Sequence, residues 1–511
     1  MLAKTFSAAV IGVDAYTVEV EINATGQGDI DFISIVGLPD AAVRESKERV
    51  RSALGSSAFY PPEGATIVNL APADIKKEGA AFDLPIALGM LAATQHIDRT
   101  KLSRTAVLGE LALDGSVRPV KGALPIAVHL AQESHIDALL VPWQNAEEAA
   151  LAAGNFPVYP IHNLYEAVSF FNNGDVAPYL ADLKSYLENK TDHEPDFAEV
   201  KGQAMARRAM MIAAAGSHNA LMVGPPGTGK SMIARRLPGI LPPMNLAETL
   251  ETSEIHSVLG MLSSGMPLMN ERPFRSPHHT ISDVGLVGGG KNPTPGEISL
   301  AHNGVLFLDE LPEFKRNVLE VMRQPMEDGI VHVSRAAGSF SFAARFMLIA
   351  AMNPCPCGMM DARHGCTCKP NEVKRYRGKI SGPLLDRIDL HVEVLHLSDD
   401  QLMSAPNGES SAAMRAKVIR ARNIQAERFK GTGIFSNSAM TSRHLHQFCA
   451  LGRSEQTMLR HAINKFNLSP RAYDRILKVA RTIADLKGLA AIDYDSLLEA
   501  VNYRNFDRKE W

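Results

Sequence analysis

The chain has 511 residues, of which 45% are hydrophobic and 21% charged, so a disordered or fibrous chain is excluded. Its 53 Lys and Arg residues nearly balance its 56 Asp and Glu residues, so any nucleic-acid partner must be held by a local basic lining. No apolar run approaches the roughly 20 residues of a membrane span, and the first residues do not form a signal peptide. We therefore expect a cytoplasmic protein without a membrane partner, and at about 150 residues per domain the length predicts three or four domains.

The first predicted domain spans residues 1–172 and is an α/β unit. Alternating apolar residues predict strands at 18–22 and 66–70. Apolar positions at helical spacing predict helices at 40–54 and 85–93.

Two further domains follow an acidic segment. Residues 173–200 contain more acids than lysines and two prolines, which predicts a linker, although a solvated face of the first domain is the alternative. Residues 201–400 are predicted to form a second α/β unit. Residues 401–511 are predicted to be helical, because charged and apolar residues follow helical spacing at 412–429 and 473–486.

A phosphate-binding loop is predicted at residues 224–231, where the sequence matches G-x-x-x-x-G-K-[ST]. An apolar strand at 220–223 and a helix at 231–237 give the required context. The glycines allow backbone N–H groups to curl around a phosphate, and the helix N-terminus favours its charge. Lys230 is expected to reach the β- and γ-phosphates, and Ser231 to ligate Mg²⁺. The residues predicted to contact ATP are Gly224, Pro225, Pro226, Gly227, Thr228, Gly229, Lys230 and Ser231. The alternative is a chance glycine-rich turn.

The second half of such a site is predicted at Asp309 and Glu310, which follow the apolar run at 305–308. Such a run is typical of a buried parallel strand. We expect Asp309 to hold Mg²⁺ through water and Glu310 to polarise the attacking water as a general base. Alternatively, the two acids cap the next helix, at 317–322.

Four of the five cysteines are clustered in the pattern C-x-C, eight residues, C-x-C. Thiolates on a short loop suit a tetrahedral Zn²⁺ ion, so Cys355, Cys357, Cys366 and Cys368 are predicted to form a structural zinc site. A redox-labile pair of thiols is the alternative, and His364 could replace one ligand.

These motifs, together with two longer segments, resemble those of a known family. Residues 296–304 (GEISLAHNG) run toward Asp309 and Glu310, and residues 381–390 (SGPLLDRIDL) follow later. Both segments resemble the magnesium-chelatase-like branch of the AAA+ ATPases, and the N-terminal unit narrows the resemblance to the YifB/ComM family. The resemblance implies an AAA+ P-loop α/β core followed by a C-terminal helical lid.

The resemblance also implies three polar residues that sense or stabilise the phosphates. Asn353 is similar to the sensor-1 residue that orients the lytic water, although Asn353-Pro354 is also an ordinary turn start. Arg387 resembles an arginine finger supplied to a neighbouring subunit; a salt bridge with Asp386 or Asp389 is the alternative. Arg471 resembles sensor 2. A finger acting in trans requires a homo-oligomer, and the family implies a hexamer.

Two inserts in the second α/β unit offer basic tips. One contains Lys291 beside a glycine run, and the other, at 330–342, is predicted to form a hairpin containing Arg335. In ring ATPases of this branch such hairpins point into the central pore, so Lys291 and Arg335 are the candidate DNA contacts. The alternative is that both are exposed basic residues on ordinary loops.

The N-terminal unit resembles the Lon protease domain, an S5-type fold, at residues 77–83 and 115–122. When the matching segments are compared, the position of the Lon serine falls on Ala81 and that of the lysine on Leu124. Neither side chain can perform nucleophilic catalysis. We therefore predict a fold that has been reused without its catalytic dyad.

The sequence and its resemblance together predict an oligomeric ATPase motor that needs ATP and Mg²⁺ and acts on single-stranded or branched DNA without sequence preference. The family implies helicase or branch-migration work on recombination intermediates in natural transformation. The alternatives are a chelatase- or chaperone-type ATPase that remodels a protein partner, and an ATP-dependent protease, which Ala81 and Leu124 disfavour.

Overall fold

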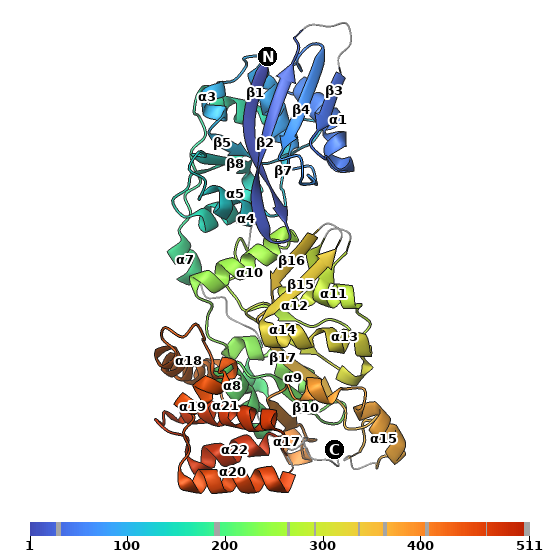
Figure 1. Ribbon diagram of the computed structural model, residues 1–511, viewed down its shortest axis with the longest axis vertical. Coiled ribbons are helices and arrows are strands. Elements are labelled where there is room, and N and C mark those ends of the chain that lie inside the picture. The colour runs from blue at the N-terminus through green and yellow to red at the C-terminus, as the bar shows by residue number, and fades with distance from the viewer. Residues whose placement is uncertain are drawn as a thin grey trace. The chain divides into compact units, whose positions relative to one another are not determined.

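The computed structural model describes residues 1–26, 32–188, 195–262, 266–290, 293–335, 338–360, 365–403, 408–466 and 468–504 (Figure 1). The chain divides into two compact units, which are described separately. Unit 1 contains residues 1–190 and 245–270, and unit 2 contains residues 191–244 and 271–511. Residues 245–270, which the sequence places in the second α/β domain, therefore pack with the N-terminal segment. No helix in the described parts of the chain is long and apolar enough to cross a membrane.

Unit 1 is built on a mixed seven-stranded sheet in the order β3-β4-β2-β1-β5-β8-β9. Its first two strands form a long antiparallel hairpin, whereas β5, β8 and β9 are parallel. The predicted strands at 18–22 and 66–70 lie in β2 and β4. The strands are β1 (Leu2–Ile11), β2 (Asp14–Ala24), β3 (Phe32–Val36), β4 (Ala65–Ala71), β5 (Thr105–Val107), β8 (Ala138–Pro142) and β9 (Val158–Ile161), with a separate hairpin of β6 (Glu110–Leu111) and β7 (Val117–Arg118).

Helices complete the hydrophobic core of unit 1. The side chain of Asp40 accepts a hydrogen bond from the Val43 N–H, so α1 begins where the sequence predicts. Every residue of α2 is buried, because almost the whole helix is apolar. The helices are α1 (Ala41–Ser56), α2 (Asp83–Ala93), α3 (Arg99–Leu102), α4 (Ala123–Leu130), α5 (Trp143–Ala153), α6 (Leu164–Asn172), α7 (Leu183–Glu188) and α10 (Leu246–Val258).

Helix α10 explains why residues 245–270 belong to unit 1. It packs against α4, where the N–H of Gly122 donates to the carbonyl of Ser257 at 3.0 Å. Leu124 is fully buried and clusters with Leu151 and Leu268. The position at which a Lon-type lysine would stand is thus part of an apolar contact.

Unit 2 is built on a parallel five-stranded sheet in the order β11-β14-β17-β10-β18. All residues of β10, β14 and β17 are buried, as expected for parallel strands covered on both faces. The strands are β10 (Ala220–Val223), β11 (Phe274–Arg275), β14 (Val305–Leu308), β17 (Met347–Met352) and β18 (Leu390–Glu393). Two hairpins lie outside this sheet, β12 (Gly288–Gly289) with β13 (Thr294–Pro295) and β15 (Ile330–Arg335) with β16 (Gly338–Ala343).

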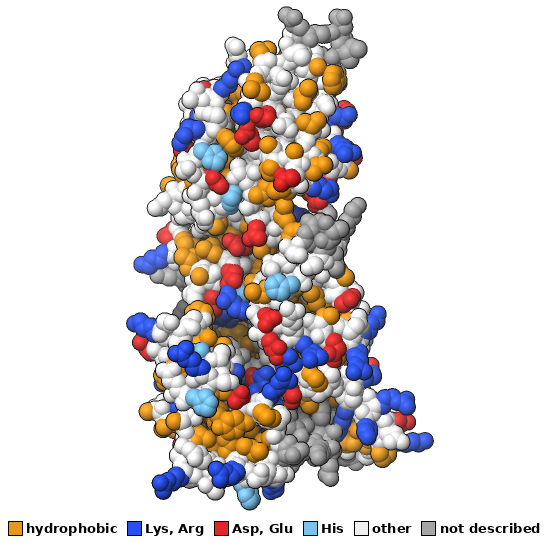
Figure 2. Space-filling view, in the orientation of Figure 1, with side chains coloured by type: hydrophobic (Ala, Val, Ile, Leu, Met, Phe, Trp, Pro, Cys, Tyr) orange, Lys and Arg blue, Asp and Glu red, His pale blue; other side chains and the backbone are white. Residues whose placement is uncertain are grey.

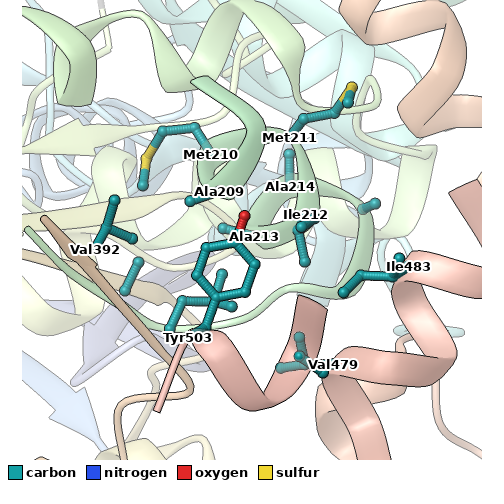
Figure 3. Packing of buried hydrophobic residues seen from close by; sticks show 14 of the residues in the cluster. Ala209, Met210, Met211, Ile212, Ala213, Ala214, Val392, Val479, Ile483 and Tyr503 are labelled. Atoms are coloured by element: carbon teal, nitrogen blue, oxygen red, sulfur yellow. The ribbon is translucent and has the colours of Figure 1, made fainter. Parts of the chain in front are cut away.

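Helix α8 lies at the centre of the apolar core of unit 2. Its Ala and Met residues pack between Val392 of β18 and the helices near the C-terminus, including Val479 and Ile483 (Figure 3). The helices of unit 2 up to residue 403 are α8 (Ala204–Gly216), α9 (Lys230–Arg235), α11 (Asp283–Val287), α12 (Glu297–Leu300), α13 (Arg316–Val321), α14 (Arg323–Asp328), α15 (Pro370–Arg377), α16 (Gly382–Leu385) and α17 (Asp399–Met403). Short 3₁₀ turns occur at Phe197–Glu199, Leu237–Ile240, Leu311–Glu313 and Asn437–Ala439.

The C-terminal part of unit 2 is helical. Ser469 caps the helix α21 and Pro470 occupies its first turn, while Gly488 ends it in the left-handed conformation. The helices are α18 (Ser411–Arg428), α19 (Ser442–Phe448), α20 (Arg453–Phe466), α21 (Pro470–Lys487) and α22 (Tyr494–Asn502). The predicted helices at 412–429 and 473–486 correspond to α18 and α21.

Candidate active site

Residues 224–229 form a loop between the buried strand β10 and helix α9, and Lys230 and Ser231 are the first residues of that helix (Figure 1). Gly227 and Gly229 have φ angles of +79° and +89°, which other residues adopt only with strain. Gly224 is required for another reason: a Cβ atom there would lie 2.0 Å from the carbonyl oxygen of Val394. The glycines of the motif thus fit a tight backbone cradle, and the loop leads into a helix N-terminus that favours an anion.

The side chain of Lys230 lies inside this loop, and the residue is 8% exposed. Its Nζ donates to the carbonyls of Gly224 and Pro225 at 2.7 and 2.8 Å. Burial lowers the pKa of Lys230, while the negative charges of Asp309 and Glu310 oppose this shift. A phosphate would offer this desolvated ammonium a charged partner, so the residue suits the predicted role.

Ser231 and Asp309 meet although they are far apart in sequence. The Ser231 hydroxyl donates to Asp309 Oδ2 at 2.6 Å, because β14 ends at Leu308 beside the loop. Two hard oxygen donors at a phosphate loop are the ligand type that Mg²⁺ prefers. The predicted Mg²⁺ pair therefore fits the ion in chemistry and in placement.

Glu310 extends beyond the end of β14 into solvent. Its backbone is left-handed, with φ +53°, and its side chain is 56% exposed. Glu310 Oε2 lies 3.4 Å from Nδ1 of His279, whose ring stacks beside His278. The carboxylate is thus open to water, as a general base must be, and His279 is a neighbour that the sequence motifs did not indicate.

Asn353 follows β17, which is the direct neighbour of β14 in the sheet. Its Oδ1 lies 3.3 Å from Nζ of Lys230, so the side chain faces the phosphate loop. The structure therefore brings Lys230, Ser231, Asp309 and Asn353 together at the carboxyl ends of three strands.

Arg387 lies at the opposite ends of the strands of the same sheet, where β18 begins. It precedes β18, which runs parallel to β10 in the register Ala220↔Leu390, whereas the phosphate loop follows the other end of β10. The four residues of β10 separate the two ends of the strands by about 13 Å, at 3.3 Å per residue. Arg387 therefore cannot contact a phosphate held by the loop of its own chain.

Arg387 is buried, with only 7% of the residue exposed. Its Nη2 pairs with Glu327 Oε1 at 2.5 Å and its Nη1 donates to the carbonyl of Pro383 at 2.7 Å. The salt bridge is thus made with Glu327 of α14, and not with Asp386 or Asp389, the alternatives that the sequence suggested. Glu327 lies 60 positions away along the chain, which is why local reading missed it.

Arg471 occupies the first turn of α21 and is exposed. Arg475, one turn later on the same helix, pairs with the buried Asp389, and Arg481 further along is buried in the core.

The four clustered cysteines form a compact group. Their Sγ atoms all lie within 4.8 Å of one another, and three of the separations are 3.4, 3.6 and 3.6 Å. Tetrahedral sulfur ligands about 2.3 Å from zinc would be about 3.8 Å apart, so the set fits such an ion. Backbone N–H groups near Met359 lower the pKa of Cys357 to about 6, which favours a thiolate at this position, whereas burial raises the pKa of Cys355. His364, the alternative ligand, lies outside the described residues.

The cysteine loop adjoins the phosphate loop. A Cβ at Gly358 would lie 2.6 Å from the Pro226 ring, and Gly358 has φ +79°. The guanidinium of Arg377 donates from Nε and Nη2 to the carbonyl of Pro354, at 3.0 and 2.8 Å. The cluster is therefore placed to brace the backbone between Asn353 and α15.

The structure describes only the backbone around one of the two predicted DNA contacts. Lys291 lies outside the described residues, and so does the side chain of Arg335. The hairpin that carries Arg335 is confirmed, with Ile330 paired to Ala343 and Arg335 to Gly338.

Comparison with known families covers most of the chain. The family described as "Magnesium chelatase, subunit ChlI" matches residues 196–402. Two further descriptions match, "Subunit ChlI of Mg-chelatase" at residues 18–145 and "Magnesium chelatase, subunit ChlI C-terminal" at residues 408–504.

Individual relatives match over nearly the full length. Competence protein ComM of Haemophilus influenzae is 44% identical over 508 residues, covering 98% of this chain and 97% of that protein. YifB of Escherichia coli is 40% identical over 509 residues, covering 99% and 98%. The magnesium-chelatase subunit ChlI of Euglena gracilis is more distant, at 20% over 264 residues, with 47% and 66% covered.

A parallel sheet carrying a phosphate loop after β10, with acidic residues at the end of β14, the next strand but one, defines the class of P-loop ATPases. The identity of 40% or more to ComM and YifB, over nearly the full length of each chain, then shows the family. The chain belongs to the YifB/ComM family of magnesium-chelatase-like AAA+ ATPases.

Proposed function

We propose that this chain is an oligomeric ATPase motor that acts on DNA. The observation that carries the proposal is the placement of its polar residues on one sheet. Lys230, Ser231 and Asp309 lie at the carboxyl ends of the strands. Arg387 lies at their amino ends, just before β18 begins. A single chain therefore holds two complementary halves of a site, which only an assembly can join.

Each of the polar residues around the phosphate loop has a chemical role in hydrolysis. Lys230 and the loop N–H groups would hold the phosphates, and Ser231 with Asp309 would hold Mg²⁺, which neutralises charge on the phosphate oxygens when bound. Glu310 would take a proton from the attacking water, and Asn353 would orient that water. Arg387 of a neighbouring chain would stabilise charge on the transferring phosphoryl group.

The assembly that joins the halves is proposed to be a ring, and the family resemblance favours a hexamer. In this scheme the helices of residues 401–511 form the lid, and Arg471 acts as sensor 2. Exposure of Arg471 at the start of α21 leaves it available for a phosphate.

Two observations favour DNA as the partner. A relative that covers nearly the whole chain is named a competence protein. In addition, α15 and its flanks expose more cations than acids, and Figure 2 shows Lys and Arg side chains gathered where α15 lies in unit 2. The exposed cations are Lys369, Lys374, Arg375 and Lys379. Such a surface binds phosphates without sequence preference, which suits helicase or branch-migration work.

Unit 1 is proposed to be a Lon-like fold without protease activity. Leu124 is buried among leucines, and the Ala81 carbonyl accepts a hydrogen bond from the Gly109 N–H. We assign this unit to assembly or to a nucleic-acid surface.

The test is the ATPase rate without DNA, with single-stranded DNA and with a four-way junction. We expect stimulation by DNA, and the largest stimulation by the junction. Glu310→Gln removes the general base, so turnover should fall about 100-fold or more under every condition. Turnover that DNA does not change would contradict the motor and favour remodelling of a protein partner.

We also propose that the four clustered cysteines hold one structural Zn²⁺. Elemental analysis should give about one zinc per chain. Cys357→Ser with Cys366→Ser should lose the metal and lower the melting temperature, because metal binding contributes to folding. Cys449→Ala removes a buried thiol outside the cluster and should keep the zinc. A folded wild-type protein without metal would show that the thiols serve another purpose.

A further inference from the structure

The backbone that carries Arg387 is held from several sides. It is a short connection between α16 and β18, and its conformation decides where the guanidinium is presented. The side-chain N–H of Asn219, just before β10, donates to the Arg387 carbonyl at 3.1 Å. The Asn219 carbonyl accepts from the N–H of Asp389 at 2.9 Å. One anchor of the finger segment 387–389 is therefore the sheet itself.

The second anchor is the carboxylate of Asp389, which is 2% exposed. Its Oδ2 accepts the backbone N–H of Asn219 at 3.2 Å and lies 3.1 Å from Nδ1 of His218. Its Oδ1 pairs with Nη1 of Arg475, from α21. Although burial opposes ionisation, the charge of Arg475 and the contact with His218 hold the pKa of Asp389 well below its usual range.

Among the contacts of Asp389 described above, Arg475 supplies the charged group that comes from α21, and its side chain is 21% exposed. Helix α21 itself is fixed in place by its packing on α8, through residues such as Val479 and Ile483. His218 extends the same network, since its Nε2 lies 2.8 Å from Oγ1 of Thr482, two turns along α21. A rigid helix thus directs a cation at the carboxylate two residues from the finger.

We propose that Arg475 is a positioning residue for the arginine finger of its own chain, acting through the buried Asp389. The inference rests on the proposed function, in which Arg387 completes the site of a neighbouring subunit. In this arrangement the C-terminal helices of one chain control hydrolysis at the phosphate loop of the next. Arg475 contacts the finger segment and no residue of its own phosphate loop among the contacts described.

The test mixes two variants, so that the finger-donating role and the ATP-holding role of a subunit are assigned to different chains. Chains with Lys230→Ala can donate a finger but cannot hydrolyse ATP at their own loop, and chains with Arg387→Ala can hold ATP but donate no finger. A mixture of the two should recover turnover that neither has alone. Arg475→Gln is then added to one kind of chain or to the other.

On the finger-donating chains, Arg475→Gln should lower the turnover of the mixture at least tenfold. On the ATP-holding chains, it should leave the turnover within twofold of the parent mixture. Arg475→Lys, which keeps a cation at this position, should restore part of the turnover on the finger-donating chains. If Arg475→Gln does not fold, Arg475→Lys replaces it on the finger-donating and on the ATP-holding chains.

Arg208→Gln is the matched control. Arg208 pairs with Glu499 at 2.8 and 3.0 Å, so it too joins a core helix to the C-terminal helices, but it contacts no residue of the finger segment. Its effect should be equal in both placements, and melting temperatures of all variants measure the structural cost.

Equal loss in both placements of Arg475→Gln would mean that Arg475 only supports the fold, and loss confined to the ATP-holding chains would assign it to its own nucleotide. Either outcome overturns the inference. A parent mixture without turnover would instead overturn the completion of sites in trans, and the inference with it.

Discussion

Lys230→Ala is expected to raise the Kd for ATP about 100-fold and to abolish measurable hydrolysis. The wild-type ammonium is buried and contacts only neutral oxygens, the carbonyls of Gly224 and Pro225 and the amide of Asn353. A phosphate gives it a charged partner in a desolvated site, and such a bond contributes about 3 kcal/mol, or about two decades of affinity. Isothermal titration with ATP and Mg²⁺ measures the change directly.

The same substitution should not unfold the chain. A buried ammonium without a charged partner is costly, and burial lowers the pKa of Lys230, so removing it relieves a desolvation penalty. Without nucleotide the variant should melt at the wild-type temperature or above, and the increase that ATP gives the wild type should be lost. Lys417→Ala, which breaks a half-exposed ion pair with Glu409, should retain that increase. Tight ATP binding by the Lys230 variant would refute the phosphate-loop assignment.

The sequence was most informative where one short segment determines the geometry. The phosphate loop needs glycines, a lysine and a hydroxyl at fixed spacing, and the structure places Gly227 and Gly229 at positive φ as that spacing requires. Alternation and apolar runs likewise located β2, β10 and β14, since burial on one or both faces is a local property of strands. Asp309 and Asn353 lie near each other in the structure, because the parallel neighbours β14 and β17 end on the same side of the sheet.

Long-range charge pairs could not be predicted in this way. Arg475 and Asp389 are 86 positions apart, and Arg387 and Glu327 are 60 apart, so no periodicity joins them. The packing of residues 245–270 with unit 1 was also missed. It depends on contacts such as those of Leu268 with Leu124 and Leu151, and these side chains would fit any apolar surface.

Arg387→Ala is expected to lower kcat for ATP about 1000-fold while leaving the Kd for ATP unchanged. An arginine finger supplies a bidentate cation to charge that develops in the transition state, and its removal costs about 10³ or more in rate. The sheet separates Arg387 from its own phosphate loop, so ground-state binding in the same chain does not depend on it. Single-turnover hydrolysis and titration with the non-reactive Glu310→Gln background distinguish the two effects.

The substitution also removes a contact within the chain, which the controls must separate from catalysis. Arg387 pairs with Glu327 of α14, and the guanidinium of this buried residue must leave this partner to reach a neighbour's phosphate. Arg323→Ala breaks another Arg–Glu pair, between the start of α14 and Glu320 of α13 at 2.7 Å, and should reduce stability without a comparable loss of turnover. Arg387→Lys keeps the charge but not the planar fork, so it should recover only a small part of the rate. Wild-type turnover by the Ala variant would return Arg387 to a purely structural role, holding α14 against the segment before β18.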